Sequence, residues 1–475
     1  MLEKTDTMCK VVAAFSTPEV HVRTGVVALT LAVLVIAPRA AHAQFSFDAR
    51  RIGMGGVSLS RDGNVRRYNP AYRAVKNRSS VSGAPKFSMP VPLGLIQFMK
   101  DHPLNQLGHD PAFNPSSTAF NPVELMNLVF NPPIFYEVRP APAPTNDVEF
   151  TVGRNQLVMN LGGARVLIPE DKFGLGTTSR LLDFGMGFGG VHVGVMGFLQ
   201  YDVGFTLDSA LRQALTDTVV GFQPSTNYNI LGDGVAQAGF APTISFATRV
   251  MRGKGGGDDS DDGIYVGVAG HYYVGASYAR ARGPAGFVTG NPIFGSTPLG
   301  VVDDTLYTAN GTLQGHGFGG DAGIAWITGP FEVGFGANDI GAELTWSDTK
   351  VQWIHYNAGT DSISTTLVAN HVQSKTKLPI TYVANAAMRM GTGTTVGGDV
   401  VNSGRGSVIH VGVEQRTGPF ALRGGVARDQ RKKIQFGWGG GFRLGPLGLD
   451  VGFWTHSNSL SPERAITMAT SISIY

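Results

Sequence analysis

Residues 407–453 read SVIHVGVEQRTGPFALRGGVARDQRKKIQFGWGGGFRLGPLGLDVGF. Within Ile409–Glu414, isoleucine and valine occupy the odd positions, and histidine, glycine and glutamate occupy the even ones. Side chains of a strand point alternately to its two faces, so this pattern predicts strands with one bulky apolar face and one small or polar face. In a soluble sandwich the bulky face would meet a protein core, whereas in a transmembrane β-barrel it meets lipid and the polar face lines the lumen. Nearly every strand of the C-terminal stretch Pro379–Tyr475 repeats the pattern. The predicted fold class is therefore an all-β, antiparallel transmembrane β-barrel.

The connections between the predicted strands support a barrel, because short and long ones alternate. Bacterial barrels have tight periplasmic turns and longer outer loops. The tight turns are predicted at Gly189-Gly190, Thr328–Pro330, Gly391–Gly393, Thr417–Pro419 and Gly445-Pro446. The long connections are predicted near Asp208–Val235, Gly283–Gly315, Ser347–Leu378 and His456–Glu463, and Met251–Gly263 breaks the alternation. Counting strands from Leu157 to the C-terminal end predicts about 14, an even number as such barrels require.

Residues 1–43 are expected to be a cleaved signal peptide. An apolar run, Gly25–Ala37, is followed by the small-residue cleavage motif Ala41–Ala43. An N-terminal membrane anchor is the alternative, and it is disfavoured because the run is too short to span a bilayer comfortably. The single cysteine, Cys9, lies inside this segment. The mature chain would then lack cysteine, which suits an exported protein.

Composition narrows the remaining classes of protein. After residue 43 no stretch approaches about 18 consecutive apolar residues, so helical membrane spans are not predicted. The formal net charge of +3 argues against a nucleic-acid partner. The 65 glycines and the low charged fraction of 15% fit a curved sheet whose inward glycines keep a lumen open. A disordered low-complexity chain is disfavoured because aromatic and β-branched residues are interleaved with the glycines.

The predicted organisation is a signal peptide (1–43), an N-terminal hatch, periplasmic or plug segment (44–150), and the transmembrane barrel (151–475). The middle segment is rich in proline and asparagine, and it could plug the lumen, line its mouth or lie loose. Short helices are predicted at Asn121–Leu128 and, within an outer loop, at Asp208–Ala214.

The start of the mature chain resembles a known family. Asp48–Val57 reads DARRIGMGGV and is followed by Tyr68-Asn69-Pro70-Ala71. This order resembles the opening of the FadL-type outer-membrane barrels, a superfamily of long-chain fatty-acid transporters, aromatic-hydrocarbon channels and barrel subunits of type IX secretion. Glycine-rich motifs of the last third, such as Gly317–Gly323, look closer to the secretion-type and conjugation-associated branch.

The resemblance implies an N-terminal hatch inside the barrel and, in the transporters, a hydrophobic ligand that leaves through a lateral opening in the wall. The residues that carry the hatch motif are Gly53, Met54, Gly55, Gly56, Asn69 and Pro70.

Charged residues on the predicted inward faces form a candidate lumen charge cluster near the tight turns. Its members are Arg389, Asp399, Glu414, Arg423, Arg443 and Asp450. Opposite charges on neighbouring strands can pair across the sheet and stiffen the barrel. The functional alternative is a selectivity constriction, as rings of charge provide in pores. The structural interpretation is preferred, and a charge that faced lipid instead would cost about 2–4 kcal/mol at mid-membrane.

Motifs for catalysis, cofactors and metals are weak. Asp258–Gly263 resembles the start of a calcium loop, but Ala269 stands where the bidentate glutamate is expected, so a solvated acidic turn is preferred. The sequence lacks a Gly-x-Ser-x-Gly elbow, a His-Glu-x-x-His motif and a Walker loop. We therefore predict no catalytic, cofactor or metal site and no enzyme activity.

Two functions are compatible with these features. The first is outer-membrane transport of hydrophobic small molecules such as fatty acids. The second is a non-conducting barrel that binds or assembles partners in a secretion or envelope complex. The expected partners are membrane lipid, the barrel-assembly machinery, a hydrophobic small-molecule ligand and, for the second function, an envelope protein. The last strand departs from the usual assembly signal, because Tyr475 shares its face with Ser471 and Ser473.

Overall fold

The computed structural model divides into two compact units, Met1–Ala40 with Pro92–Glu137, and Ala41–Val91 with Val138–Tyr475. In the first unit, helix α6 (Leu93–Asp101) carries a hydrogen bond of 2.8 Å from Gln97 Nε2 to Asp101 Oδ2. Strand β2 (Tyr136–Val138) begins in the same unit. The structure describes residues 48–58, 63–75, 85, 87–103, 109–111, 136–138, 149–153, 156–160, 173–217, 221–253, 260–291, 293, 303–309, 313–357, 362–391, 393–403, 406–430, 434–455 and 466–475.

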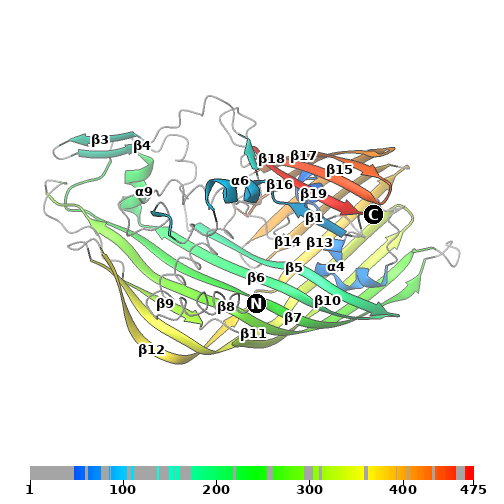
Figure 1. The fold of residues 1–475 in the computed structure, drawn as a ribbon, viewed down its shortest axis with the longest axis horizontal. Coiled ribbons are helices and arrows are strands. Elements are labelled where there is room, and N and C mark those ends of the chain that lie inside the picture. Colours follow the sequence, from blue (N-terminus) through cyan, green and yellow to red (C-terminus); the bar gives the residue numbers. More distant parts are fainter. Residues whose placement is uncertain are drawn as a thin grey trace, which may run out of the picture. The chain divides into compact units, whose positions relative to one another are not determined.

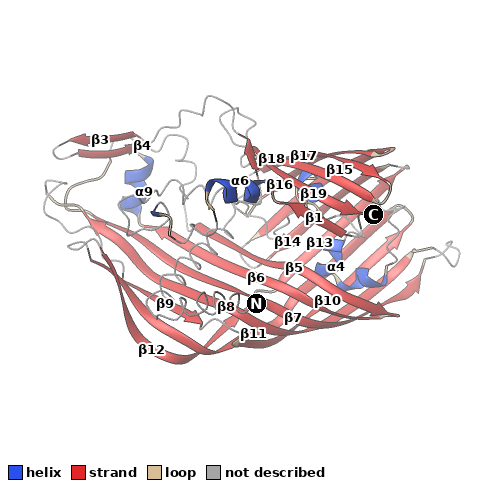
Figure 2. Ribbon diagram, viewed as in Figure 1, coloured by secondary structure: helices blue, strands red, loops and turns tan. Residues whose placement is uncertain are grey.

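The second unit is built around one large antiparallel sheet (Figures 1 and 2). Along the chain, the strands of this sheet that lie wholly in the second unit are β1 (Phe87–Val91), β5 (Phe173–Phe188), β6 (Val191–Leu207), β7 (Asn227–Arg252), β8 (Gly263–Val288), β9 (Asp303–Ala309), β10 (Gly315–Thr328), β11 (Phe331–Asn357), β12 (Ser362–Lys377), β13 (Thr381–Met390), β14 (Thr394–Asn402), β15 (Ser407–Thr417), β16 (Phe420–Arg428), β17 (Ile434–Leu444), β18 (Leu447–Thr455) and β19 (Ile466–Ile474). Apart from β1, each position in the sheet pairs with its neighbour along the chain, as in a meander. The prediction of an all-β chain with one large antiparallel sheet is confirmed.

Two positions in the sheet are shared by two strands that lie end to end. β9 and β10 both pair with β8 and with β11, and β12 and β13 both pair with β11. β1 pairs with β19, with Phe87 opposite Ile474 and Val91 opposite Thr470. The width of the sheet agrees with the predicted number of about 14 strands.

One predicted strand belongs elsewhere. The strand expected near Leu157 is β4 (Gln156–Asn160), and it pairs only with β3 (Glu149–Gly153) in a separate two-stranded sheet among the described residues. Its place in the large sheet was therefore predicted wrongly, and β1 supplies a strand that was not predicted. Pro90 explains the omission, because proline lacks the amide hydrogen that a strand interior needs and normally counts against a strand.

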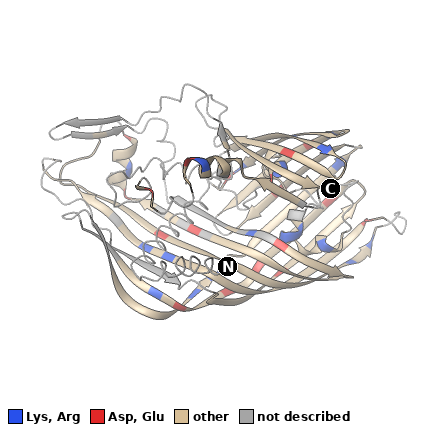
Figure 3. Cartoon of the chain, viewed as in Figure 1, with Lys and Arg blue, Asp and Glu red and all other residues tan. Residues whose placement is uncertain are grey.

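Burial alternates along the strands as the sequence pattern predicts. In β15 the side chains at Val408, His410, Gly412 and Glu414 are buried, and those between them are exposed. The bulky outward side chains do not meet a second layer: Leu422, for example, is 70% exposed. Figure 3 shows charged residues only sparsely along the ribbons. This face has the apolar character of a surface that contacts lipid.

The tight turns lie where they were predicted, and each contains a glycine in a conformation that favours it. Gly189, Gly329, Gly391, Gly418 and Gly445 have φ between 53° and 63°, in the left-handed region that side chains disfavour. The exceptional connection between β7 and β8 is closed by a hydrogen bond of 3.0 Å from Gly253 N to Asp262 O. The first two residues of the acidic run, Asp258 and Asp259, lie outside the described residues.

Three strands are far longer than a bilayer requires. β7 and β8 have 26 residues each and β11 has 27, whereas a transmembrane strand needs about 9–11. At about 3.3 Å per residue, 26 residues extend roughly 85 Å. The long loop predicted at Ser347–Leu378 is therefore wrong, because β11 continues to Asn357 and β12 occupies Ser362–Lys377.

Helix α9 (Ser209–Thr216) confirms the helix predicted at Asp208–Ala214. The Asp208 carboxylate accepts a hydrogen bond of 2.7 Å from Leu211 N and so caps the first turn. Leu211 packs in a buried cluster with Phe222 and Tyr228. The helix predicted at 121–128 and the signal peptide at 1–43 lie outside the described residues. No helix in the described part of the chain has the length and apolar character needed to cross a membrane.

Candidate functional site

The described N-terminal residues 48–58 and 63–75, here called the inner segment, lie against the buried face of the sheet. Its first helix contacts β16, β17, β18 and β19, whereas its last turn contacts β7, β8 and β10. These two groups of strands are separated in the order of the sheet, so the sheet must curve around the segment to reach both. The helices of the inner segment are α3 (Ala49–Gly53), α4 (Gly63–Tyr68) and the 3₁₀ helix η1 (Pro70–Ala74).

The predicted hatch motif sets the turns of the inner segment. α3 ends at Gly53 and Met54 caps it, after which Gly55 and Gly56 have φ of 71° and 93°. Such values favour glycine, so the motif allows the chain to reverse immediately after the helix. Met54 is 1% exposed.

The second half of the motif begins η1. The Asn69 carbonyl oxygen of the side chain accepts a hydrogen bond of 3.0 Å from Ala71 N, and Pro70 occupies the first position of the turn. Asn69 Nδ2 also donates to Ile324 O of β10 at 3.0 Å. The asparagine therefore caps η1 and fastens it to the sheet. The role of these residues as a hatch remains a prediction.

Inward glycines of the sheet make room for the backbone of the inner segment. A β-carbon built on Gly412 or Gly425 would lie 2.3 or 2.1 Å from Met54 O, and one built on Gly336 would lie 2.2 Å from Tyr68 O. Contacts this short do not occur for real β-carbons, so these positions admit only glycine while the segment stays where it is. The glycines were predicted to bend the sheet and keep a lumen open, and at these positions they seat the inner segment.

Glu414 lies at the centre of a buried charge cluster between α3 and strands β15, β16 and β18. Its carboxylate accepts hydrogen bonds from Arg50 Nε at 2.9 Å and Nη2 at 3.0 Å, and from Arg423 Nε at 2.7 Å. Arg423 Nη1 lies 2.7 Å from Asp450 Oδ1, and Asp450 Oδ2 accepts from Ser473 at 2.7 Å. The side chains of Arg50, Glu414, Arg423 and Asp450 are all at most 2% exposed. The cluster therefore joins the inner segment to the sheet.

The other three members of the predicted cluster lie apart from Glu414. Asp399 contacts His410 Nδ1 at 2.5 Å and accepts a hydrogen bond of 2.5 Å from Ser58 N of the inner segment. Arg389 donates to Glu332 on the neighbouring strand β11. The Arg443 guanidinium stacks over the ring of Tyr475, 4.4 Å from its centroid. The structure therefore brings together Glu414, Arg423 and Asp450, and it distributes the remaining predicted residues over separate contacts.

A second buried charge cluster was not predicted from the sequence. Arg180 of β5 donates to Asp321 of β10 at 2.5 and 2.7 Å and to Asp339 of β11 at 2.9 Å. Arg180 Nη1 also donates to Arg67 O of the inner segment at 2.7 Å. Strand parity could have marked Asp321 as inward, but Asp339 lies at an irregularity of β11 with φ of 60°, where parity fails. A single sequence does not show which residues of distant strands form pairs.

A third contact fastens the end of the inner segment. Arg73 Nη2 donates to Asp183 Oδ2 of β5 at 2.5 Å, and Arg73 Nη1 lies 2.8 Å from His192 Nδ1 of β6. Tyr72 is fully buried, and its hydroxyl accepts from Asn385 Nδ2 of β13 at 2.9 Å. The inner segment thus has polar contacts with strands in several parts of the sheet.

Three residues next to the second cluster have the spacing of a catalytic relay. Asp321 Oδ2 lies 2.7 Å from His271 Nε2, and His271 Nδ1 lies 2.8 Å from Thr243 Oγ1. Thr243 directs its hydroxyl to Ala241 O at 3.0 Å, and both Thr243 and His271 are only 4% exposed. A buried hydroxyl already bonded to a carbonyl is not available as a nucleophile. We interpret the relay as part of the buried polar network.

An apolar cluster occupies the inner face above the second charge cluster. Trp346 of β11 stacks on Tyr278 of β8, with ring centroids 5.1 Å apart, and Phe198 of β6 meets Tyr273 edge-on at 5.2 Å. Leu344 is fully buried in the same cluster. These aromatic side chains are at most 4% exposed, so they fill the inner face with packed apolar groups, unlike the polar lumen of a water-filled porin.

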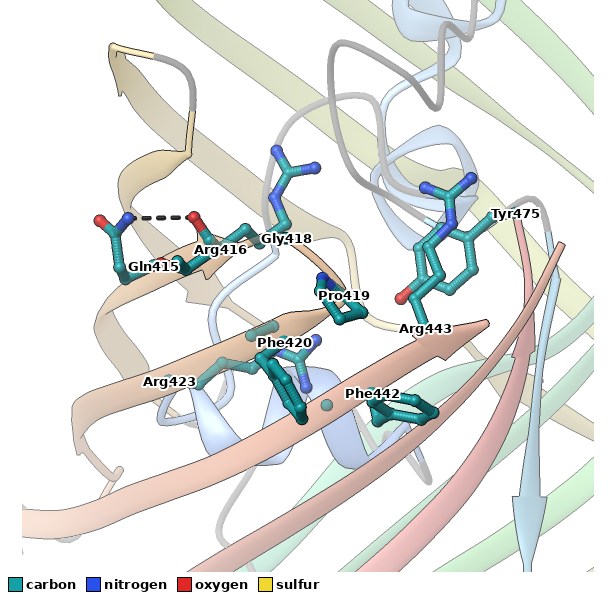
Figure 4. Close-up of a pocket in the computed structure, with 12 residues that line it drawn as sticks. Gln415, Arg416, Gly418, Pro419, Phe420, Arg423, Phe442, Arg443 and Tyr475 are labelled. Atoms are coloured by element: carbon teal, nitrogen blue, oxygen red, sulfur yellow. Dashed lines mark hydrogen bonds between the residues drawn. The ribbon is translucent and has the colours of Figure 1, made fainter. Parts of the chain in front are cut away.

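A cavity of about 420 Å³ lies at the end of the sheet that carries the tight turns (Figure 4). Arg416, Arg423 and Arg443 line it together with Tyr475. Figure 4 shows Arg416 and Arg443 projecting to the side opposite Phe420. In the part of the chain that the structure describes, no group of three or more histidine, cysteine or acidic residues is arranged to hold a metal ion.

Comparison with known proteins gives structural similarities only. No protein-family model and no curated protein matches the sequence. A TodX deltaS2S3 mutant monoaromatic hydrocarbon channel is 11% identical with a TM-score of 0.30, covering 71% of this chain and 98% of that chain. The toluene transporter TbuX of Ralstonia pickettii is 10% identical with a TM-score of 0.29, covering 70% and 96%. A triple mutant of the Rhodopseudomonas blastica porin is 9% identical with a TM-score of 0.20, covering 60% and 100%. These TM-scores are all below 0.5.

Proposed function

We propose that this chain is a FadL-like outer-membrane β-barrel that carries hydrophobic small molecules across the outer membrane, with the inner segment as its plug. The outward apolar side chains of the strands fit a lipid environment. The opening motif, whose glycines and asparagine shape the inner segment, fits the hatch of that superfamily. In this proposal the sheet closes on itself and the tight turns face the periplasm.

The observation that supports the choice of cargo is the apolar cluster around Trp346 on the inner face, whose aromatic side chains are at most 4% exposed. An apolar molecule that parted these side chains would bury its own surface among them, at about 25 cal/mol per Å² of apolar area. A pore for polar solutes would need polar groups there instead. The cargo class is therefore hydrophobic, and fatty acids and aromatic hydrocarbons are both candidates.

Uptake by cells tests the proposal. The chain is expressed in an outer-membrane host that lacks its own hydrophobic transporters, and uptake of labelled toluene and of a labelled long-chain fatty acid is measured. We expect protein-dependent uptake of at least one of them and a several-fold loss in Trp346→Ala. Phe331→Ala is the matched control, because Phe331 is 49% exposed on the outer face. Uptake that is the same with and without the protein would refute transport.

A second candidate is a non-conducting barrel that binds a partner in an envelope complex. The length of β7, β8 and β11 favours it, since strands of 26 and 27 residues extend well beyond a bilayer and present a large surface. Affinity purification from detergent-solubilised membranes separates the two candidates. Recovery of a stoichiometric envelope protein together with an absence of uptake would favour the second.

A further inference from the structure

The cavity at the turn end of the sheet has more guanidinium groups than carboxylates. Arg50, Arg416 and Arg423 all converge on the single carboxylate of Glu414, with Arg416 Nε the most distant at 3.5 Å. Arg423 also pairs with Asp450. In the described part of the chain no carboxylate forms an ion pair with Arg443, whose Nε donates instead to Gly445 O at 2.9 Å. Four guanidiniums therefore share two side-chain carboxylates.

Hydrogen-bond donors of this cluster remain unused. Among the described residues, Arg416 Nε and Arg423 Nη1 are buried and have no partner with hydrogen-bond geometry. Arg423 Nη1 is close to Asp450, but the angle is not that of a hydrogen bond. Buried guanidinium donors without acceptors are unfavourable, so an added acceptor in the cavity would stabilise them.

The position of these groups makes them accessible to a ligand. Strand parity places Arg416, Arg423 and Arg443 on the inner face, whereas Phe420 and Phe442 are 59% and 43% exposed on the outer face. The Arg416 side chain is 24% exposed, so it reaches the cavity while Arg423 stays buried beneath. The ring of Tyr475 holds the Arg443 guanidinium at the cavity by a cation–π contact.

We propose that this cavity binds an oxyanion, a carboxylate or a phosphate, through Arg416 and Arg443. A planar guanidinium presents a fork of donors that matches the two oxygens of a carboxylate or phosphate. The volume of about 420 Å³ exceeds that of a single water molecule many times, so it can admit an anionic head group with part of its chain. The inference deepens the proposed transport function, on which its physiological role rests. It assigns the head group of an amphiphilic acid to the turn end of the barrel.

Isothermal titration of the full chain in non-ionic detergent tests the site with three probes. Hexanoate supplies a carboxylate, hexan-1-ol supplies the same chain without the charge, and inorganic phosphate supplies the free anion. The protein is compared with the double variant Arg416→Gln/Arg443→Gln. Arg428→Gln is the matched control, because Arg428 is exposed at the opposite end of β16.

We expect the double variant to bind hexanoate at least tenfold more weakly, because a hydrogen bond to a charged group contributes about that factor. Arg428→Gln should bind hexanoate as the unchanged chain does, and hexanol binding should not respond to either change. Hexanoate binding to the unchanged chain should weaken as salt rises. The salt dependence is measured on the unchanged chain, so it tests the proposal even if the double variant does not fold.

The titration with phosphate shows which kind of anion the site binds. Phosphate that displaces hexanoate supports a general oxyanion site, and phosphate that binds alone supports the site for a phosphate-bearing ligand. The proposal is overturned if neither anion binds the unchanged chain at millimolar concentration, or if both bind the folded double variant equally well. Toluene uptake separates this outcome from the proposed function: lost anion binding with retained uptake refutes only the site, and Arg-dependent anion binding without uptake refutes only transport.

Discussion

Glu414→Gln should release the start of the inner segment from the sheet. Glu414 accepts two hydrogen bonds from Arg50 and one from Arg423, and all three side chains are at most 2% exposed. Glutamine keeps one acceptor oxygen but removes the negative charge that faces the buried guanidiniums of Arg50 and Arg423. Breaking a buried ion pair by removing one partner costs about 3–5 kcal/mol. We expect the loss to fall on the contact between α3 and the sheet.

Equilibrium unfolding in urea from lipid vesicles measures this loss. Glu343→Gln is the matched control, because Glu343 is 38% exposed and pairs only with the exposed Lys375 and Lys377 at 3.3 and 3.8 Å. An exposed pair contributes about 0–1 kcal/mol, so the control should unfold nearly as the unchanged chain does. Protease sensitivity of the inner segment should rise in Glu414→Gln alone.

A double-mutant cycle isolates the contact with the inner segment. Arg50→Gln and Glu414→Gln are measured singly and together. If the two groups interact as the distances indicate, the combined change in free energy of unfolding should be smaller than the sum of the single changes by about 1–3 kcal/mol. Additive changes, or a Glu414→Gln variant as stable as Glu343→Gln, would refute the assignment of this cluster as the anchor of the segment.

Three further changes test the other contacts. Gly425→Ala should destabilise the docked segment by about 1–3 kcal/mol, since its β-carbon would lie 2.1 Å from Met54 O, and Gly424→Ala, which has open space around it, should change urea unfolding by less than about 0.5 kcal/mol. Asp321→Asn should lower the free energy of unfolding by about 3–5 kcal/mol in the same assay, because it removes the charge that faces a buried arginine. Gly418→Ala should lower it by about 1–2 kcal/mol, because φ is 59° at that turn, and no change there would contradict the turn assignment.

Local features of the fold were predictable because their causes are local. The alternation in Ser407–Thr417 follows from the need of one face to meet apolar surroundings, and burial follows it residue by residue. The cap at Asp208 and the glycine at Gly418 are signalled by residue type, since aspartate is among the residues preferred at a helix N-cap and glycine is the residue favoured at positive φ.

Strands without a clear apolar face and contacts between distant strands were not predictable. β12 (Ser362–Lys377) has polar residues on both faces, so the apolar alternation that marks the other strands is missing even though its Thr, Ser and Val residues suit a strand. Asp339 sits at an irregularity that resets parity. Arg50 belongs to a motif that can be read in the sequence. Its partner Glu414 lies 364 residues away, and nothing in a single sequence distinguishes Glu414 from the other carboxylates as that partner.

The way the inner segment is held constrains how it can move. Main-chain atoms of Met54 and Tyr68 pack on glycines, and their side chains pack in buried apolar clusters against the sheet. The segment also carries the ion pairs of Arg50 and Arg73 and accepts the hydrogen bond from Arg180. Each would leave a charge exposed to a poorly solvated interior if the segment withdrew without water following it. Withdrawal of the segment from the sheet therefore requires water to enter the sheet first.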